Sequence, residues 1–412
     1  MTWSIRRVSE RPPSSLSPMR FAPLVERVAG KGVGTWVTHT QARLLIESGV
    51  DVILLTVGNP DQKPAATMID TTVAALRAGR TLHAPTIGYP KLRAAIASRS
   101  ERRSGRACAA ENVAVVPGAQ GGLFSALSCI AGAGDEVIVP EPIYATYEGV
   151  VGATGTTMVT VPLDPARGFP PDLAALEAAI TPRTRVIWIN TPHNPTGAVF
   201  TAAEMEAIAA LCRAHDLWLL SDEVYEDLAF ARPHVGAWSL PDMAERTAVV
   251  SSLSKAHAVP AYRLGWVIGP PDLIRHISNL LLSVTYGGPA FLQDGALAAL
   301  SGDLPEVAAL HEDYRRRAVL MCRLLAEALH CRVVPPEGGM FIMLDIRPSG
   351  LSADAFAHGL LDSERVAVLP CDGFGASAEG YLRISLGAPD DRIREAGERI
   401  VRYAQRLAQR PL

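Results

Sequence analysis

Short apolar runs recur along most of the chain and are separated by longer segments in which apolar residues return at helical spacing. The runs lie at residues 52–55, 113–116, 136–139, 158–161, 186–189, 218–220, 248–250 and 264–268. Strands that alternate with helices form α/β folds, and the sheets of such folds are mostly parallel. The pattern therefore predicts an α/β protein with a largely parallel sheet.

The pattern changes toward the C-terminus. A long helical segment runs from about Leu304 to Leu329, and short strand-like runs follow it at residues 339–344 and 381–384. Short strands after a long helix no longer alternate in the way that builds a parallel sheet. We therefore expect a second, smaller α+β domain in this part of the chain.

A lysine follows one of the predicted strands in a pattern that indicates chemistry. Ser252, Ser254 and Lys255 come directly after the run 247–251, and Arg263 follows eight residues later. Burial lowers the pKa of a lysine readily, and an uncharged lysine amine is a nucleophile. Hydroxyl groups and a guanidinium beside it can hold a phosphate. A surface lysine in a serine-rich turn is the alternative, but the ordered residues favour a lysine that bonds a phosphorylated aldehyde.

A second candidate phosphate site lies upstream. The run 113–116 is broken by Pro117 and Gly118, and a helical segment that begins with Ala119 and Gln120 follows. Free N–H groups at the start of a helix bind phosphate, and small residues let it approach closely. A glycine-rich turn between a strand and a helix also occurs for packing alone.

Taken in order, these segments resemble the fold-type-I pyridoxal-phosphate enzymes, and within them the class I and II aminotransferases, above all the arginine–pyruvate transaminases. The resemblance extends from about Phe21 to Ala408. Matching stretches lie at residues 136–148, 181–185, 192–198, 215–225 and 338–346. The resemblance implies pyridoxal 5'-phosphate as cofactor, an amino acid and a 2-keto acid as substrates, and a homodimer that completes the active site from both subunits.

The implied fold is that of aspartate aminotransferase, with a large domain around a mostly parallel sheet and a smaller α+β domain. We expect residues 51–300 to form the large domain. Residues 301–412 are expected to form the small domain, and the resemblance adds residues 21–50 to it. Residues 1–20, which contain a Pro/Ser cluster, are expected to form a loose N-terminal segment.

The resemblance also gives individual residues their expected roles. Lys255 carries the cofactor and later acts as the base, and Asp222 pairs with the pyridine nitrogen. A buried carboxylate keeps that nitrogen protonated, although an Asp after a strand is also a common helix N-cap. Asn194 and Tyr225 match positions that bond the phenolic oxygen of the cofactor. Residues expected at its phosphate are Gly118, Ala119, Gln120, Ser252, Ser254 and Arg263.

Two further residues complete the expected site. Tyr144 matches the position whose ring stacks on the pyridine, although buried tyrosines are common in cores. Arg383, inside the apolar run 381–385, matches the arginine that binds the substrate α-carboxylate, with Asn194 beside it. A planar guanidinium suits a carboxylate, and an arginine within an apolar strand needs an anion to offset its burial.

The chain departs from the family pattern at several positions. His83 stands where the family commonly has a tyrosine that reaches the phosphate of the neighbouring subunit. A protonated His83 could make that contact, and a surface histidine without this role is equally compatible. Gln62 replaces an aromatic residue after the loop Gly58–Asp61, and Ala261-Tyr262 replaces a Gly-Trp pair.

The resemblance favours a substrate with a guanidino side chain, although the donor, the acceptor and the pathway stay open. Asp61 and Glu337 are acids near the expected substrate site, and either could be an ordinary turn residue. A modified arginine such as enduracididine, an amino acid of antibiotic biosynthesis, is a compatible hypothesis. A β-lyase or an arginine oxidase would share most of these motifs. A cofactor-binding regulator is disfavoured because only about twenty residues precede Phe21.

The composition of the chain indicates its class of protein and excludes some classes of partner. The chain has 412 residues, of which 48% are hydrophobic and 20% charged, with a net charge of −3, as expected for a globular enzyme of two domains. The sequence has no basic run with interleaved aromatic residues of the kind that indicates binding of nucleic acid. It also has no apolar stretch of the kind that indicates a membrane span and no signal-peptide core that indicates export. The six cysteines and ten histidines show no metal-ligand spacing. We expect a cytoplasmic enzyme without a bound metal.

Overall fold

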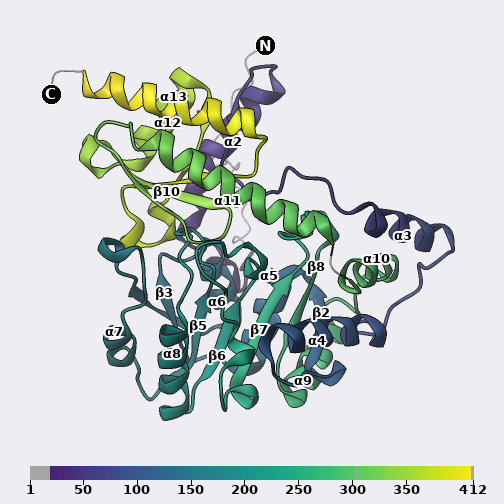
Figure 1. The fold of residues 1–412 in the computed structure, drawn as a ribbon. Helices are drawn as coiled ribbons and strands as arrows, with labels where there is room; N and C mark the ends of the chain where they lie inside the picture. The colour runs from purple at the N-terminus through teal and green to yellow at the C-terminus, as the bar shows by residue number, and fades with distance from the viewer. Residues whose placement is uncertain (1–18, 303, 410–412) are drawn as a thin grey trace.

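The computed structural model describes residues 19–302 and 304–409 (Figure 1). Most of the predicted loose segment, residues 1–18, therefore lies outside the described residues. The described chain contains two separate β-sheets of four or more strands, each with helices packed against it. No helix in this part of the chain has the length and apolar character needed to cross a bilayer.

The larger sheet has seven strands in the order β2-β8-β7-β6-β5-β3-β4. In chain order the strands are β2 (Val113–Pro117), β3 (Glu136–Glu141), β4 (Thr157–Pro162), β5 (Thr184–Asn190), β6 (Trp218–Asp222), β7 (Thr247–Ser252) and β8 (Leu264–Ile268). All neighbours are parallel except β8, which runs antiparallel to both β2 and β7. The prediction of an α/β fold with a largely parallel sheet is confirmed.

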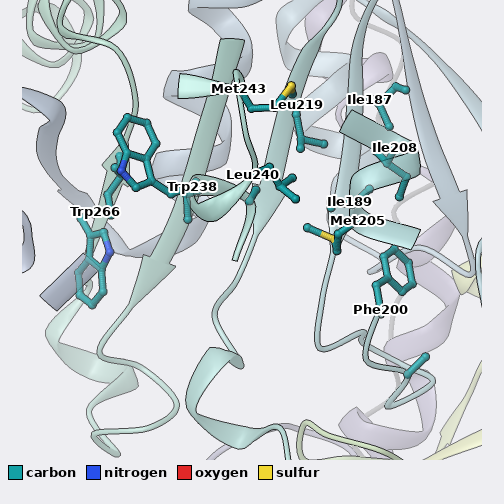
Figure 2. Packing of buried hydrophobic residues seen from close by; sticks show 14 of the residues in the cluster. Ile187, Ile189, Phe200, Met205, Ile208, Leu219, Trp238, Leu240, Met243 and Trp266 are labelled. Carbon is teal, nitrogen blue, oxygen red and sulfur yellow. The ribbon is translucent and has the colours of Figure 1, made fainter. Parts of the chain in front are cut away.

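Helices lie on both sides of this sheet. They are α3 (Ala66–Arg77), α4 (Pro90–Ser104), α5 (Gly118–Ile130), α6 (Tyr147–Thr154), α7 (Leu173–Ala178), α8 (Ala202–Ala214), α9 (Pro271–Val284) and α10 (Ala290–Leu300). The first of them, α3, packs against α10. In β5, Ile187 and Ile189 pack on the face that also holds Trp238 and Trp266 (Figure 2), while Val186 and Trp188 pack on the opposite face. Burial of both faces explains why the strands read as continuous apolar runs.

The smaller sheet is antiparallel, with the strand order β12-β13-β10-β9. These strands are β9 (Arg332–Val334), β10 (Phe341–Asp345), β12 (Leu369–Pro370) and β13 (Tyr381–Ser385). Its helices are α11 (Pro305–Leu325), α12 (Ala353–Glu364) and α13 (Asp390–Ala408), which lie together at the top of Figure 1. Near the N-terminus, α1 (Leu24–Arg27) precedes α2 (Val37–Glu47), whose Ala42 packs in one cluster with Leu361 of α12.

The predicted strand at residues 52–55 does not join the large sheet. Residues Ile53–Leu54 form β1, which pairs in parallel with β11 (Val366–Ala367). Ile53 and Leu55 belong to the same buried cluster as Phe341 of the small sheet, so their apolar side chains are covered there. The expected start of the large domain at residue 51 therefore includes a strand that packs with the small sheet. The domain boundaries themselves stay a prediction.

The packing of β8 against α5 can be tested at one position where their backbones lie very close together. A Cβ built on Gly265 would lie 2.7 Å from the carbonyl carbon of Gly118 and 2.9 Å from the amide nitrogen of Ala119. Because these neighbours are backbone atoms, we expect Gly265→Ala to destabilise the fold by about 1–3 kcal/mol. Denaturant unfolding measures the loss. Gly132→Ala, whose Cβ would meet nothing within 4 Å, is the control and should be nearly neutral. Equal stability of the two variants would contradict this account of the packing.

Candidate active site

A cavity of about 150 Å³ lies at the carboxyl ends of the parallel strands β5, β6 and β7. Open α/β sheets bind ligands at this edge, since consecutive parallel strands end there together. The residues that line the cavity include Ala119, Gln120, Tyr144, Tyr147, Asn190, Asn194, Asp222, Tyr225, Ser252, Ser254, Lys255 and Arg263. The structure thus brings together most of the residues that the sequence predicted for the site.

Lys255 lies three residues after the end of β7, with its side chain directed into the cavity. Its Nζ donates a hydrogen bond to the carbonyl oxygen of Gly58 at 2.7 Å. Burial lowers the pKa of Lys255 to about 8, and the positive charge of Arg383 adds to this lowering while Asp222 opposes it. About a tenth of the amine is therefore uncharged at pH 7 and is available as a nucleophile or base.

Asp222, the last residue of β6, is buried beneath the cavity. Its carboxylate accepts a hydrogen bond from the hydroxyl of Tyr147 at 2.6 Å and another from the N–H of Val224 at 3.3 Å. Burial raises the pKa of Asp222 to about 6 in spite of these donors. The sequence did not indicate Tyr147 as a functional residue, because only the fold brings α6 beside the end of β6.

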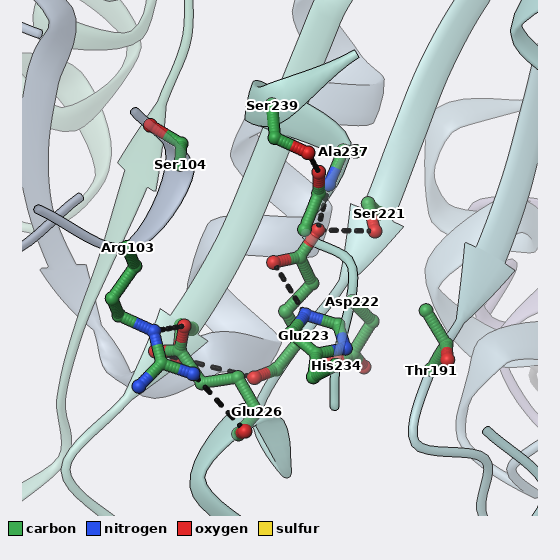
Figure 3. A network of polar contacts seen from close by, with 12 residues as sticks. Arg103, Ser104, Thr191, Ser221, Asp222, Glu223, Glu226, His234, Ala237 and Ser239 are labelled. Atoms are coloured by element: carbon green, nitrogen blue, oxygen red, sulfur yellow. Dashed lines mark hydrogen bonds and ion pairs between the residues drawn. The ribbon is translucent and has the colours of Figure 1, made fainter. Parts of the chain in front are cut away.

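Glu223 lies on the other side of the chain from Asp222, as expected for consecutive residues at the end of a strand. Figure 3 shows its carboxylate with three partners, namely the hydroxyl of Ser221 at 2.8 Å, the N–H of Ala237 at 2.7 Å and Nε2 of His234 at 3.1 Å. Burial acts to raise the pKa of Glu223, but these partners outweigh it and the pKa is lowered. The network holds the chain around Ala237 against β6, directly behind Asp222.

A cradle for an anion forms one wall of the cavity. Helix α5 begins at Gly118, so the free amides of its first turn face the site, and Ser252, Ser254 and Arg263 lie opposite. Gly118 has a φ of +69°, and a Cβ there would collide with the guanidinium of Arg263. Arg263 also donates to the carbonyl of Pro260 at 3.0 Å. A helix N-terminus, two hydroxyls and a guanidinium are the donor set that a phosphate requires.

Arg383 connects the small sheet with the large one. It lies in β13 with 1% of its surface exposed and donates to Oδ1 of Asn194 at 3.0 Å and to the carbonyl of Thr56 at 2.7 Å. The rings of Phe341 and Phe374 lie 4.1 Å and 5.1 Å from its Cζ atom. Among the described residues it forms no ion pair with a carboxylate, and its Nε has no partner. A buried guanidinium of this kind is suited to bind an anionic ligand.

The two tyrosines that the sequence singled out both line the cavity. Burial raises the pKa of Tyr225 well above its ordinary value, so its hydroxyl stays a donor. Tyr144 meets the ring of Tyr147 edge-to-face at a centroid distance of 5.8 Å. Tyr147 in turn packs on Trp188, 4.2 Å between centroids, which fixes the aromatic wall against the core of the sheet.

His83 lies apart from these residues. It is exposed, does not line the cavity, and packs against the ring of Tyr286 at 4.9 Å. Its predicted contact belongs to a neighbouring subunit and stays a prediction.

The two acids considered for a guanidino substrate are already paired within this chain. Both carboxylate oxygens of Asp61 bond the guanidinium of Arg317, at 2.6 Å and 2.9 Å. Glu337 pairs with Arg232 and also accepts the N–H of Val199 at 3.1 Å. A substrate guanidinium would therefore have to share either acid with an arginine of this chain.

Comparisons with known proteins show the family of this chain. The family model described as "Aminotransferase class I and II" matches residues 50–400. Arginine–pyruvate transaminase AruH of Pseudomonas aeruginosa is 47% identical over 389 residues, which cover 94% of this chain and 99% of that protein. The aspartate/prephenate aminotransferase of Thermus thermophilus is 33% identical over 381 residues, covering 92% of this chain and 97% of that protein.

Solved structures show the same likeness. The aspartate aminotransferase of Thermus thermophilus with maleate superposes with a TM-score of 0.88 at 33% sequence identity, and the match covers 93% of this chain and all of that one. N-Succinyldiaminopimelate aminotransferase from Mycobacterium tuberculosis gives a TM-score of 0.85 at 33% identity, over 91% of this chain and 99% of that one.

The buried carboxylate of Asp222 leads to a prediction for the ligand-free protein. The pKa of Asp222 in the folded state, about 6, lies above its ordinary value of 3.8, so its charge opposes folding above pH 6 and ceases to do so near pH 4. We expect Asp222→Asn to raise the free energy of unfolding at pH 8 by up to about 3 kcal/mol, with the gain vanishing toward pH 4.

Denaturant unfolding across this pH range measures the effect. Asp242→Asn, at an exposed position, is the matched control and should change little at any pH. A stability loss for Asp222→Asn that does not depend on pH would contradict the assignment of a destabilising buried charge.

Proposed function

Because this chain belongs to the class I and II aminotransferases, which are pyridoxal-phosphate-dependent enzymes, we propose that it transfers the amino group of arginine, or of a close guanidino relative, to a 2-keto acid such as pyruvate. The observation that carries the proposal is the 47% identity to an arginine–pyruvate transaminase over nearly the whole chain. The aspartate aminotransferases among its relatives are 31–33% identical. An arginine derivative with a cyclised guanidine, such as enduracididine, carries the same cationic group and falls within the proposal.

Lys255 is proposed to hold the cofactor and then to act on the substrate. When bound, pyridoxal phosphate supplies an electrophilic aldehyde and a ring that withdraws electrons from the substrate. The Nζ atom of Lys255, partly uncharged because its pKa is lowered to about 8, is suited to bond that aldehyde. The Nζ amine, when it is not bonded to the cofactor, would take the proton from the substrate Cα as a general base and give it back as a general acid.

The remaining lining residues are proposed to orient the cofactor. Asp222, positioned by Tyr147, would hold the proton on the pyridine nitrogen. Tyr225 and Asn194 would donate to the phenolic oxygen, and Tyr144 would cover the ring. The phosphate would occupy the cradle already described, with Gly118, Ala119 and Gln120 on one side and Ser252, Ser254 and Arg263 on the other.

Arg383 is proposed to bind the α-carboxylate that both substrates share. Its guanidinium is buried without a carboxylate partner among the described residues, so a substrate carboxylate would neutralise it. Asn194, which is bonded to Arg383 and lines the cavity, would contact both the substrate and the cofactor. A single carboxylate site explains how an amino acid and a keto acid can use the enzyme in turn.

We propose that the active form is a homodimer and that His83 faces the partner subunit. Exposed apolar side chains surround this region, with Leu82 82% exposed and Tyr286 58% exposed. Segments 82–86 and 285–287 lie side by side, since a Cβ on Gly287 would touch the carbonyl of Ala84 at 3.1 Å. Apolar surface of this kind is typical of interfaces between protein chains.

The proposal is tested by the absorption spectrum of the cofactor-loaded protein as amino acids are added singly without keto acid. With L-arginine or another guanidino amino acid, we expect the visible band of the lysine-bound cofactor to fall, a near-ultraviolet band of the aminated cofactor to rise, and one keto acid to form per site. This half-reaction is what a two-step amino transfer requires.

One control variant and two alternative results define the outcome. Lys255→Ala should show neither the initial visible band nor the change. Turnover of a simple aliphatic amino acid without turnover of any guanidino one would overturn the substrate class. Release of ammonia or peroxide in place of the aminated cofactor would instead identify a lyase or an oxidase.

A further inference from the structure

Arg317 of α11 is a buried arginine that lies outside the cavity. Its side chain is 5% exposed, yet it bonds two carboxylates. Its two Nη atoms donate to Asp61 at 2.6 Å and 2.9 Å, and its Nε donates to Asp390 at 2.8 Å. Its Nη1 also donates to the carbonyl of Leu386 at 3.1 Å. A planar guanidinium that bonds a carboxylate through two parallel hydrogen bonds defines the position of that carboxylate closely.

Asp61 ends a segment, residues 55–61, that lies against the side chains of Lys255 and Arg383; we call it the 55–61 loop. Two of its backbone carbonyls bond the cationic side chains of the site. The carbonyl of Thr56 accepts from Arg383 at 2.7 Å, and the carbonyl of Gly58 accepts from Lys255 at 2.7 Å. The loop therefore contacts both the proposed carboxylate site and the proposed nucleophile through backbone atoms.

The loop is fixed at its two ends by different means. At Leu55 it continues β1, where the N–H bonds the carbonyl of Ala367 at 2.8 Å and the carbonyl accepts the N–H of Ser385 at 2.9 Å. At Asp61 the loop is held by the two hydrogen bonds from Arg317. Between the two ends, a Cβ on Gly58 would lie 2.5 Å from the ring of Phe341, so this part of the loop has little room to shift.

An ion pair of this kind needs a reason beyond stability. Exposed salt bridges contribute little, and a buried pair often stabilises no more than apolar residues would. Asp61 and Arg317 are mostly buried, with side-chain exposures of 18% and 5%. The bidentate geometry instead gives positional accuracy at the end of the loop, five residues along from Thr56, whose carbonyl accepts a hydrogen bond from Arg383.

We infer that Arg317 is a positioning residue, which acts through Asp61 to hold the 55–61 loop so that Thr56 and Gly58 orient Arg383 and Lys255. The inference rests on the proposed roles of those two side chains. It also gives Asp61 a function within the chain, because both of its carboxylate oxygens are bonded to Arg317. The effect of Asp61 then does not depend on the substrate side chain, because Asp61 positions the site for the α-carboxylate that all substrates share.

The neighbouring residue Arg316 provides a matched control. It follows the same helix and pairs with Asp390, as Arg317 does, and with Asp313 at 2.6 Å. Its side chain is 48% exposed and makes no ion pair with Asp61. Arg316→Ala therefore removes a charge from the same network without releasing the loop.

The test is calorimetric binding of unreactive carboxylates to the cofactor-loaded protein, with pentanoate and 5-guanidinopentanoate as probes. We expect Arg317→Ala to weaken the binding of both probes by about tenfold or more, because a displaced Arg383 loses the alignment that carboxylate binding needs. In steady-state assays the KM for the keto acid should rise by a similar factor. Arg316→Ala should stay within about twofold of the unaltered protein, and Arg317→Lys should recover part of the loss.

Asp61→Ala separates positioning from folding, because it leaves Arg317 bonded to Asp390 and Leu386. It should reproduce the weaker binding, and the Asp61→Ala, Arg317→Ala double variant should bind no worse than Arg317→Ala alone, as expected for two residues that act through one contact. Probe affinity for Asp61→Ala equal to that for Arg316→Ala would overturn the inference. Failure of the unaltered protein to bind either probe would overturn the role of Arg383, and the inference with it. Binding of both probes with no turnover of guanidino amino acids would leave the inference standing and remove only the proposed substrate.

Discussion

The buried guanidinium of Arg383 is the feature on which the site depends most. It lies in the small sheet, but its hydrogen-bond partners are Asn194, which follows a strand of the large sheet, and Thr56 in the loop between them. Its positive charge is also one reason why the pKa of Lys255 is lowered to about 8. A carboxylate bound at Arg383 would offset that charge and raise the basicity of Lys255. Through the position of this one side chain, carboxylate binding would therefore change the basicity of Lys255.

The large sheet carries side chains that line the cavity on one side and side chains that support the backbone on the other. Successive residues of a strand face opposite sides, so Asp222 and Ser252 face the cavity while Glu223 and Ser251 face away from it. On the far side, Glu223 bonds Ser221, His234 and Ala237 (Figure 3). Ser251 donates to Glu226 at 3.1 Å. Asp222, whose pKa is raised, thus lies back to back with Glu223 and Ser251, whose hydrogen bonds hold the backbone in place.

Much of this arrangement could be predicted from the sequence, because it follows from where strands end. Lys255, Asp222 and Asn194 each come soon after an apolar run, and parallel strands bring their carboxyl ends together. The contacts of Tyr147, Gly58 and Thr56 could not be predicted, because they join segments far apart in the chain through a helix or through backbone carbonyls. The pairing of β1 with β11 was missed for a similar reason, since an apolar run carries no mark of the sheet that it joins.

The position after Asp61 shows how a departure from a family pattern can mislead when it is taken alone. Gln62 replaces an aromatic residue beside the active-site loop, which suggests a change in the substrate pocket. In the structure its Nε2 donates to Asp313 at 3.1 Å, and Asp313 also accepts from Arg316 at 2.6 Å. Gln62 thus extends the polar network of α11 that surrounds Arg317. Because Asp61 is bonded to Arg317, the residues at 61 and 62 belong to the support of the loop. The proposed preference for a cationic side chain would then depend on other residues around the cavity.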